Sequence, residues 1–204
     1  GFWVGFLGIS SAQAASLEEA ADCLFRGRTP CAESQLAQLE AEGEEGHEFW
    51  LLKSKLAFYQ GRMSDAVESM RKVQQLRPAA FQEGTPLGDE LALMERTEEV
   101  HRQLVETKRA DITIVHHPGM DRILVDDAIE VLEKGRERIA PLLGGDPPIP
   151  LRVEIYPTGA ALTACTGLPL EAVQTTGVVA ISKWNRLLIT SPRAMGGGYG
   201  WQDT

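Results

Sequence analysis

The four histidines are the residues of this sequence best suited to metal chemistry, and their spacing argues against it. They are His47, His101, His116 and His117, and none is followed by a second histidine four positions further on. Two zinc ligands on one helical face need that spacing. His116 and His117 are adjacent in an extended stretch, so their side chains point to opposite sides. We therefore predict no metal ligands and no catalytic residue within this chain.

The three cysteines predict a covalent link between neighbouring helices. Cys23 and Cys31 lie on either side of the sequence Arg-Gly-Arg-Thr-Pro, which is typical of a turn between two helices. A disulfide between them would close that turn, and the alternative is a pair of small buried thiols. Cys165 is left over, and the absence of a Cys-x-x-Cys pair gives no support to a zinc knuckle or a thioredoxin-type site.

Charge and motifs exclude further classes of function. The sequence has no Gly-x-Ser-x-Gly, no phosphate-binding loop and no Rossmann glycine pattern. Its 204 residues carry a formal net charge of −9 and no patch of clustered Lys and Arg. Binding to nucleic acid or to an anionic membrane needs such clusters. We therefore expect a peptide or protein partner and no nucleic acid.

Residues 1–14 resemble the end of a secretory signal peptide. An apolar stretch at residues 2–9 is shorter than the about 20 residues needed to span a bilayer. Ala12 and Ala14 then fit the small-residue cleavage pattern, with the cut before Ala15. The alternatives are a buried helix end or a membrane anchor. The pattern favours an exported protein of the periplasm or cell envelope, which would contact the membrane only through this segment if it stays uncleaved.

Residues 15–109 are predicted to form a region of helical repeats. Residues 49–78 resemble one tetratricopeptide repeat (TPR), although Lys53 and Ala57 depart from the family's pattern. A single repeat cannot bury its own faces, so residues 17–42 and 87–107 are expected to stack on it as degenerate repeats, with Leu104 and Val105 on a helical stripe. The positions that match the repeat are Trp50, which should be buried between helices, and Ser54, Gly61, Ala66, Met70, Val73 and Pro78.

The pattern changes at Ala110, and residues 110–204 are predicted to form an α+β lobe. Residues 111–116 and 151–156 are rich in β-branched residues, as strands are. Asp121 is expected to cap a long helix between them, and Thr158 to begin a short one. Residues 177–182 and 186–190 are expected to form a hairpin. The chain as a whole is thus predicted to be α+β, with the order β-α-β-α-β-β in its second half.

Four segments of the second half carry a resemblance by their order and spacing: residues 153–157 (VEIYP), 166–169 (TGLP), 176–180 (TGVVA) and 188–192 (LITSP). Together they resemble the N-terminal lobe of the gluzincin-type zinc metallopeptidases, and most of all the bacterial peptidase MA-like group. In that group helical repeats often precede the peptidase domain. The resemblance implies a parent protein whose zinc ion is bound by a His-Glu-x-x-His helix that follows a segment like residues 199–204; this chain lacks that motif. The resemblance covers residues 111–204.

The resemblance also implies where a substrate would bind. Enzymes of this family pair an edge strand with the extended substrate backbone, because an edge strand has free N–H and C=O groups. The matching residues are Val178, Val179, Ala180 and Ile181. The alternative is that this strand belongs to the interior of the sheet.

Three interpretations of function follow. The first is the N-terminal portion of an exported zinc-dependent peptidase, which supplies a helical-repeat interaction surface and the substrate-strand lobe and is not itself catalytic. The second is a TPR-type module of the cell envelope that binds a peptide or protein and carries a catalytically dead α+β lobe. The third is a purely structural envelope protein. A His-Glu-x-x-His sequence encoded soon after Thr204 would favour the first, and a stop codon the second.

Overall fold

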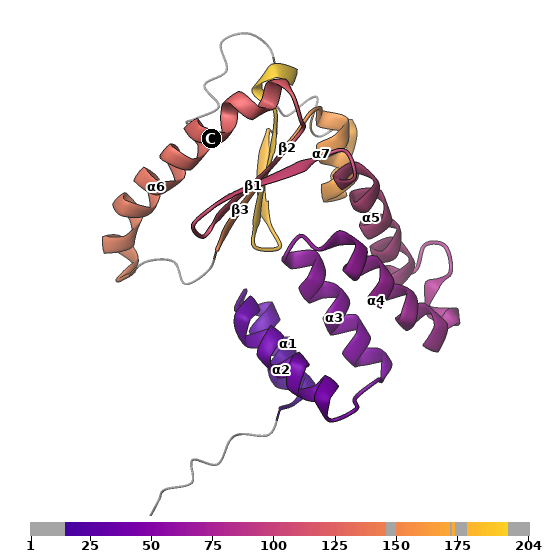
Figure 1. Ribbon diagram of the computed structural model, residues 1–204. Helices are drawn as coiled ribbons and strands as arrows, with labels where there is room; N and C mark the ends of the chain where they lie inside the picture. Colours follow the sequence, from indigo (N-terminus) through magenta and orange to yellow (C-terminus); the bar gives the residue numbers. More distant parts are fainter. Residues whose placement is uncertain (1–14, 146–149, 172, 174–178, 196–204) are drawn as a thin grey trace, which may run out of the picture.

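The computed structural model describes residues 15–145, 150–171, 173 and 179–195 (Figure 1). Helices occupy the first half of the chain and a sheet flanked by helices the second, which confirms the predicted α+β class. Figure 1 shows the first four helices below the sheet, with α5 and α7 on one side of it and α6 on the other. Within the described ranges, no helix has the length and apolar character needed to cross a membrane.

The helical half begins with two helical hairpins followed by a single helix. Local sequence signals set the starts of these helices. The hydroxyl of Ser16 accepts a hydrogen bond from the Glu19 N–H at 3.0 Å, and the hydroxyl of Thr85 accepts one from the Gly88 N–H at 3.2 Å. The elements are α1 (Leu17–Phe25), α2 (Thr29–Ala41), α3 (His47–Tyr59), α4 (Met63–Leu76), the 3-10 helix η1 (Pro78–Phe81) and α5 (Pro86–His101).

Helices α3 and α4 form the close antiparallel pair expected from the repeat-like sequence. Ser54 and Ala66 are fully buried, and the Ser54 hydroxyl donates to the Ala66 C=O at 2.8 Å. Gly61 turns the chain with a φ of +78°, a conformation that costs a residue with a Cβ about 1–2 kcal/mol. Small side chains therefore let the two helices approach, as the sequence predicted.

The disulfide and the aromatic core of the helical half bear on two of the predictions. The structure joins Cys23 and Cys31 by a disulfide, which closes the turn between α1 and α2. Trp50 was expected to be buried between helices, but it is half-buried, and its neighbour Phe49 is the aromatic residue with no exposed surface. The repeat-like spacing placed the aromatic side chain one position away from the residue that fills the core.

In the described part of the chain the strands form one five-stranded sheet with the order β1-β2-β3-β5-β4. The three central strands run parallel to one another, and each edge strand is antiparallel to its neighbour. The strands are β1 (Val105–Arg109), β2 (Ile112–His116), β3 (Leu151–Tyr156), β4 (Ala180–Lys183) and β5 (Arg186–Thr190), and the helices among them are η2 (Met120–Ile123), α6 (Leu124–Leu143), α7 (Gly159–Thr166) and η3 (Pro192–Ala194).

Strand β1 corrects the predicted extent of the helical region. Helix α5 ends at His101, so the expected helical stripe through Leu104 and Val105 is wrong. Val105 begins a strand that returns antiparallel on β2 through a tight turn at Ala110, where φ is +51°. The predicted boundary between residues 109 and 110 therefore falls between two paired strands. Among the elements whose bounds the structure describes from Val105 onward, the order is β-β-α-β-α-β-β when the 3-10 helices are left out.

Asp121 is not the cap of α6 as predicted. The residue before the helix is Ile123, which makes no side-chain capping bond. Asp121 is instead buried and accepts hydrogen bonds from the Ser191 hydroxyl at 2.9 Å and from the Arg193 Nε at 3.2 Å. A buried carboxylate needs a positive partner, and this one joins the turn before α6 to the turn after β5.

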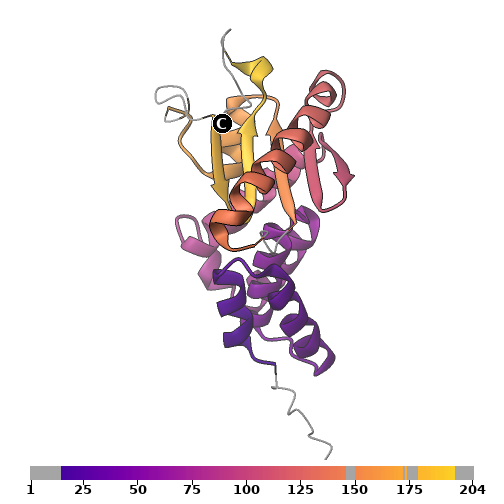
Figure 2. The same cartoon turned by 90° about the vertical axis from the view of Figure 1, so that its left-hand side faces the viewer.

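The two faces of the sheet are covered differently. Helix α6 crosses one face obliquely (Figure 2), and a core of aliphatic residues such as Ile114, Ile155 and Ile129 lies beneath it. The opposite face contacts α7 and the end of α5 through Tyr156 and Leu188. We refer to these as the α6 face and the α7 face.

The tip of the β4–β5 hairpin joins the sheet to the helical half. Trp184 and Asn185 have φ of +55° and +57°, as both central residues of a type I′ turn must. The Trp184 ring makes an edge contact with Phe58 of α3 at a centroid distance of 4.9 Å. The Asn185 amide donates to the Gly27 C=O at 2.8 Å, in the turn between α1 and α2. The lower end of β4 is therefore anchored on two helical hairpins.

Candidate functional site

Strand β4 has a free edge in the described structure, because β5 is its sole pairing partner there. The Thr190 N–H donates to the Val179 C=O at 2.8 Å, so the backbone of Val179 faces β5. Bonded and non-bonded residues alternate along an antiparallel pair. The backbone of Ile181, opposite Leu188, therefore also faces β5. The N–H and C=O groups of Ala180 and Ser182 point away from the sheet.

The register of β4 determines which of the four predicted substrate-binding residues present their backbone groups at the free edge. Val178 lies outside the described residues. Val179 and Ile181 use their backbone groups within the sheet, whereas Ala180 presents its backbone at the free edge as expected. Sequence reasoning missed Ser182. Recognising Trp184 and Asn185 as a two-residue turn would have fixed the register, and the register identifies Ser182.

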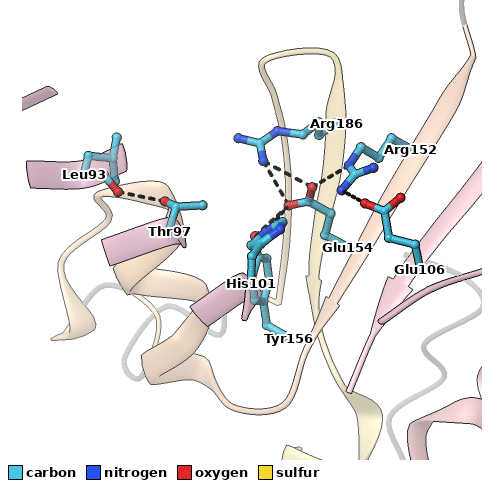
Figure 3. A network of polar contacts seen from close by, with 8 residues as sticks. All are labelled: Leu93, Thr97, His101, Glu106, Arg152, Glu154, Tyr156 and Arg186. Atoms are coloured by element: carbon cyan, nitrogen blue, oxygen red, sulfur yellow. Dashed lines mark hydrogen bonds and ion pairs between the residues drawn. The ribbon is translucent and has the colours of Figure 1, made fainter. Parts of the chain in front are cut away.

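A second polar site lies on the α7 face, centred on Glu154 of β3 (Figure 3). One carboxylate oxygen, Oε1, accepts a hydrogen bond from the Arg152 Nε at 2.8 Å. The other, Oε2, accepts one from the Tyr156 hydroxyl at 2.6 Å and lies 3.3 Å from the His101 Nε2. The Arg186 Nη1 donates to both oxygens, at 3.2 and 3.1 Å. Two strands and α5 thus meet on one carboxylate.

Burial determines the electrostatics of this network. The side chains of Glu154 and Arg186 have no exposed surface. Burial alone would raise the pKa of Glu154, but the positive charge of Arg186, helped by His101 and Arg152, outweighs it and holds that pKa well below its usual range. Glu154 is therefore ionised at any pH near neutrality.

The pKa values of two neighbouring acidic groups, Tyr156 and Cys165, are raised rather than lowered. Burial, reinforced by the charge of Glu154, raises the pKa of Tyr156 well above its usual value. Burial also raises the pKa of the Cys165 thiol to about 11. Both groups stay protonated near neutral pH, so neither is a ready nucleophile or base.

The network connects the helical half of the chain to the sheet. Figure 3 shows Arg186 and Arg152 converging on Glu154, with His101 approaching from α5. The Arg186 guanidinium lies over the ring of Phe58 in α3, 4.5 Å from its centroid, and its Nε and Nη2 have no hydrogen-bond partner among the described residues. With Glu154 and Arg186 fully buried, the cluster stabilises the contact between helices and sheet, and its central carboxylate offers no surface to a substrate.

The residues that the structure describes do not fit a zinc site. Among them, no three His, Cys, Asp or Glu side chains converge as metal ligands do. The His101 Nε2 contacts the Glu154 carboxylate. His116 is fully buried, and its Nε2 lies 3.3 Å from the Thr107 hydroxyl oxygen. A zinc ion of the kind implied by the metallopeptidase resemblance would need ligands other than these residues.

The helical half carries a groove of about 390 Å³ between α2, α3 and α4. Leu36, Trp50 and Leu56 contribute apolar surface to it. The Nζ atoms of Lys53 and Lys72 lie 5.0 and 3.9 Å from the centre of the Trp50 ring. Such cation–π contacts contribute about 0.5–1 kcal/mol each at exposed sites. The repeat-like region therefore has a surface that can receive part of a partner protein.

Comparison of the chain with protein families, with curated proteins and with solved structures finds no match.

Proposed function

We propose that this chain binds an extended polypeptide along the free edge of β4 and forms the substrate-binding part of an exported zinc-dependent peptidase. The observation that carries the proposal is the outward backbone of Ala180 and Ser182, which leaves two N–H donors and two C=O acceptors at the sheet edge. Strand addition uses such groups, because they bind a backbone of any sequence.

The anchoring of the hairpin supports this role. Trp184 and Asn185 hold the lower end of β4 against α3 and the α1–α2 turn. The Lys183 Nζ also donates to the Thr166 C=O at 3.2 Å, which ties the end of the strand to α7. A binding strand that is already rigid loses little conformational entropy when a peptide pairs with it.

In this proposal the strand edge binds the substrate polypeptide, the helical repeats supply a separate interaction surface, and the parent protein supplies the metal and the hydrolytic chemistry. A zinc ion in a peptidase polarises a water molecule for attack on the peptide bond. The contribution of this chain is to fix the direction and depth of the substrate backbone through Ala180 and Ser182.

The second candidate, a TPR-type binding module of the cell envelope, is favoured by the groove around Trp50. It would take a peptide or protein partner between α2, α3 and α4 and would leave β4 without a ligand. The two candidates place the bound polypeptide on different surfaces, so one pair of variants separates them.

We expect Ala180→Pro to weaken binding of a fluorescein-labelled octapeptide of alternating leucine and threonine at least about tenfold, measured by fluorescence polarisation. Proline removes one N–H donor at the free edge and places its ring where the peptide backbone would lie, while the ladder with β5 keeps its donors. The net loss of a hydrogen bond, about 0.5–1.5 kcal/mol, is added to this steric effect.

Ala180→Gly, which keeps the N–H, is the matched control and should bind within about threefold of the unmodified chain, a change of less than 1 kcal/mol. Unchanged binding by Ala180→Pro would remove the edge from consideration. If binding instead disappears in Trp50→Ala, the groove module is the correct function. Circular dichroism of each variant verifies that the fold is retained.

A further inference from the structure

Helix α6 covers the sheet along only part of its length. Its first turns are buried, with Val125 and Ile129 in the core beneath the helix. Further along, Ile139 is 48% exposed and Leu143 is 67% exposed. Figure 1 shows the lower end of α6 standing away from the strands, so the helix and the sheet diverge toward the hairpin tip.

The exposed residues continue the apolar line that is buried at the start of the helix. Helical residues turn by about 100° each, so Ile139 and Leu143 fall within about 20° of Leu132 around the axis. Leu132 itself packs against the core of the α6 face. Ile139 and Leu143 therefore belong to the side of α6 that faces the sheet. Leu142, by contrast, lies about 80° from that line, at its flank.

Between the diverging surfaces lies a cavity of about 400 Å³, which we call the wedge. Leu151, Val153 and Leu187 of the sheet and Leu132 of α6 line it, and Ser182 of β4 lines it at the edge of the sheet. The wedge is thus apolar on two sides and continuous with the free edge of β4.

The charged residues at the wedge make their polar contacts outside it. Arg152 and Arg186 donate to Glu154, and Lys183 donates to the Thr166 C=O. Alternation along the strands places these three side chains on the α7 face, opposite the apolar lining of the wedge. The chemistry of the wedge suits an aliphatic or aromatic side chain, because burying such a group removes apolar surface from water on both sides.

Strand β4 has small side chains on the same face. Ala180 packs with the core of the α6 face, and alternation along the strand places Ser182 on that face as well. A strand added to the edge would place alternate side chains about 4.5–5.5 Å from these two residues. Because alanine and serine occupy little space, a large side chain on the added strand can extend over them toward the wedge.

We propose that the wedge is the specificity pocket of the β4 edge and that it selects extended polypeptides with large apolar side chains at alternate positions. This inference rests on the proposed function, since the polypeptide must first pair with β4. It adds the class of substrate: apolar, strand-forming segments, of the kind that a folded protein buries and an unfolded one exposes.

The test compares two labelled octapeptides, one alternating leucine with threonine and one alternating serine with threonine. We expect the leucine peptide to bind about tenfold tighter or more by fluorescence polarisation, because its leucines leave water in the wedge. Ile139→Glu places a carboxylate on the sheet-facing side of α6, two turns beyond Leu132 of the wedge lining. It should remove most of that advantage and leave the serine peptide unaffected. Leu142→Glu is the matched control on the flank of α6 and should change neither affinity.

The other outcomes distinguish failure of the wedge from failure of the strand edge. Equal affinities for the two peptides, both abolished in Ala180→Pro, would overturn the wedge and leave the strand edge in place. A leucine preference that survives Ile139→Glu would also overturn it. If neither peptide binds the unmodified chain, the proposed function fails together with this inference. Ile139 is already half exposed, so its substitution tests binding without emptying a core position.

Discussion

Replacing Glu154 with glutamine is expected to lower the free energy of unfolding by about 3–5 kcal/mol at neutral pH. The change keeps the shape of the side chain and removes its charge. Arg186, which has no exposed surface, would then lack its carboxylate partner, and Arg152 would lose one of two. Removing one member of a buried ion pair is costly because the remaining charge stays in a medium that solvates it poorly.

Glu106→Gln is the control for this prediction. Glu106 accepts a hydrogen bond from the same Arg152, at 2.6 Å, but its side chain is 55% exposed. A surface ion pair of this kind contributes about 0–1 kcal/mol. Denaturation by guanidinium chloride, followed by circular dichroism, measures both variants. Similar losses for the two variants would mean that the buried network does not stabilise the joint between helices and sheet.

The Glu154 carboxylate makes the free energy of unfolding depend on pH. The pKa of Glu154 is held well below its usual range in the folded chain, whereas an unfolded glutamate titrates near about 4.3. Because the folded-state pKa is the lower one, the stabilisation is fully present above the unfolded pKa and is lost as the pH falls toward the folded one. The advantage of the unmodified chain over Glu154→Gln should therefore hold from neutral pH to about pH 5 and shrink below about pH 4.

The elements that the sequence predicted correctly are those with strong local signals. Thr158 caps α7, and the β-branched run at β3 forms a strand with the predicted bounds. In each case a residue restricts its own backbone or satisfies a neighbouring N–H, so no distant contact is needed.

The elements that were missed depend on partners far away in the sequence. Strand β1 has an exposed, charged sequence and is a strand because β2 pairs with it. Glu154, Arg186 and His101 come from three separate elements, and their spacing in the sequence does not predict that they are in contact. Asp121 similarly lies 70 positions from Ser191. Tertiary contacts override local preference at these places.

The candidate site was predicted at the level of the strand and not of the residue. The sequence pattern located β4, but which of its residues face outward depends on register, and a shift by one residue exchanges the two sets. The turn at Trp184 and Asn185 sets that register. A bulky residue with positive φ is uncommon in such a turn, and its reason is the contact of Trp184 with Phe58 in the helical half.

Phe49→Ala should destabilise the helical half more than Trp50→Ala, which reverses the order expected from the repeat-like sequence. Phe49 has no exposed surface and lies in a core with Leu24 and Leu36, so its removal leaves a cavity and should cost about 3–5 kcal/mol. Trp50 is half-buried at the groove, where solvent can replace part of its contacts, and we expect a loss of about 1–2 kcal/mol.

Chemical denaturation of both variants measures this difference. A larger loss for Trp50→Ala would mean that the repeat-like spacing identifies the core residue of α3 and that the helix is rotated from the orientation seen here. Helical residues are about 100° apart around the axis, so Phe49 points into the core while Trp50 packs against its edge and lines the groove. The smaller cost at Trp50 is also what allows Trp50→Ala to serve as a test of the groove, because a variant that keeps its fold can report on binding.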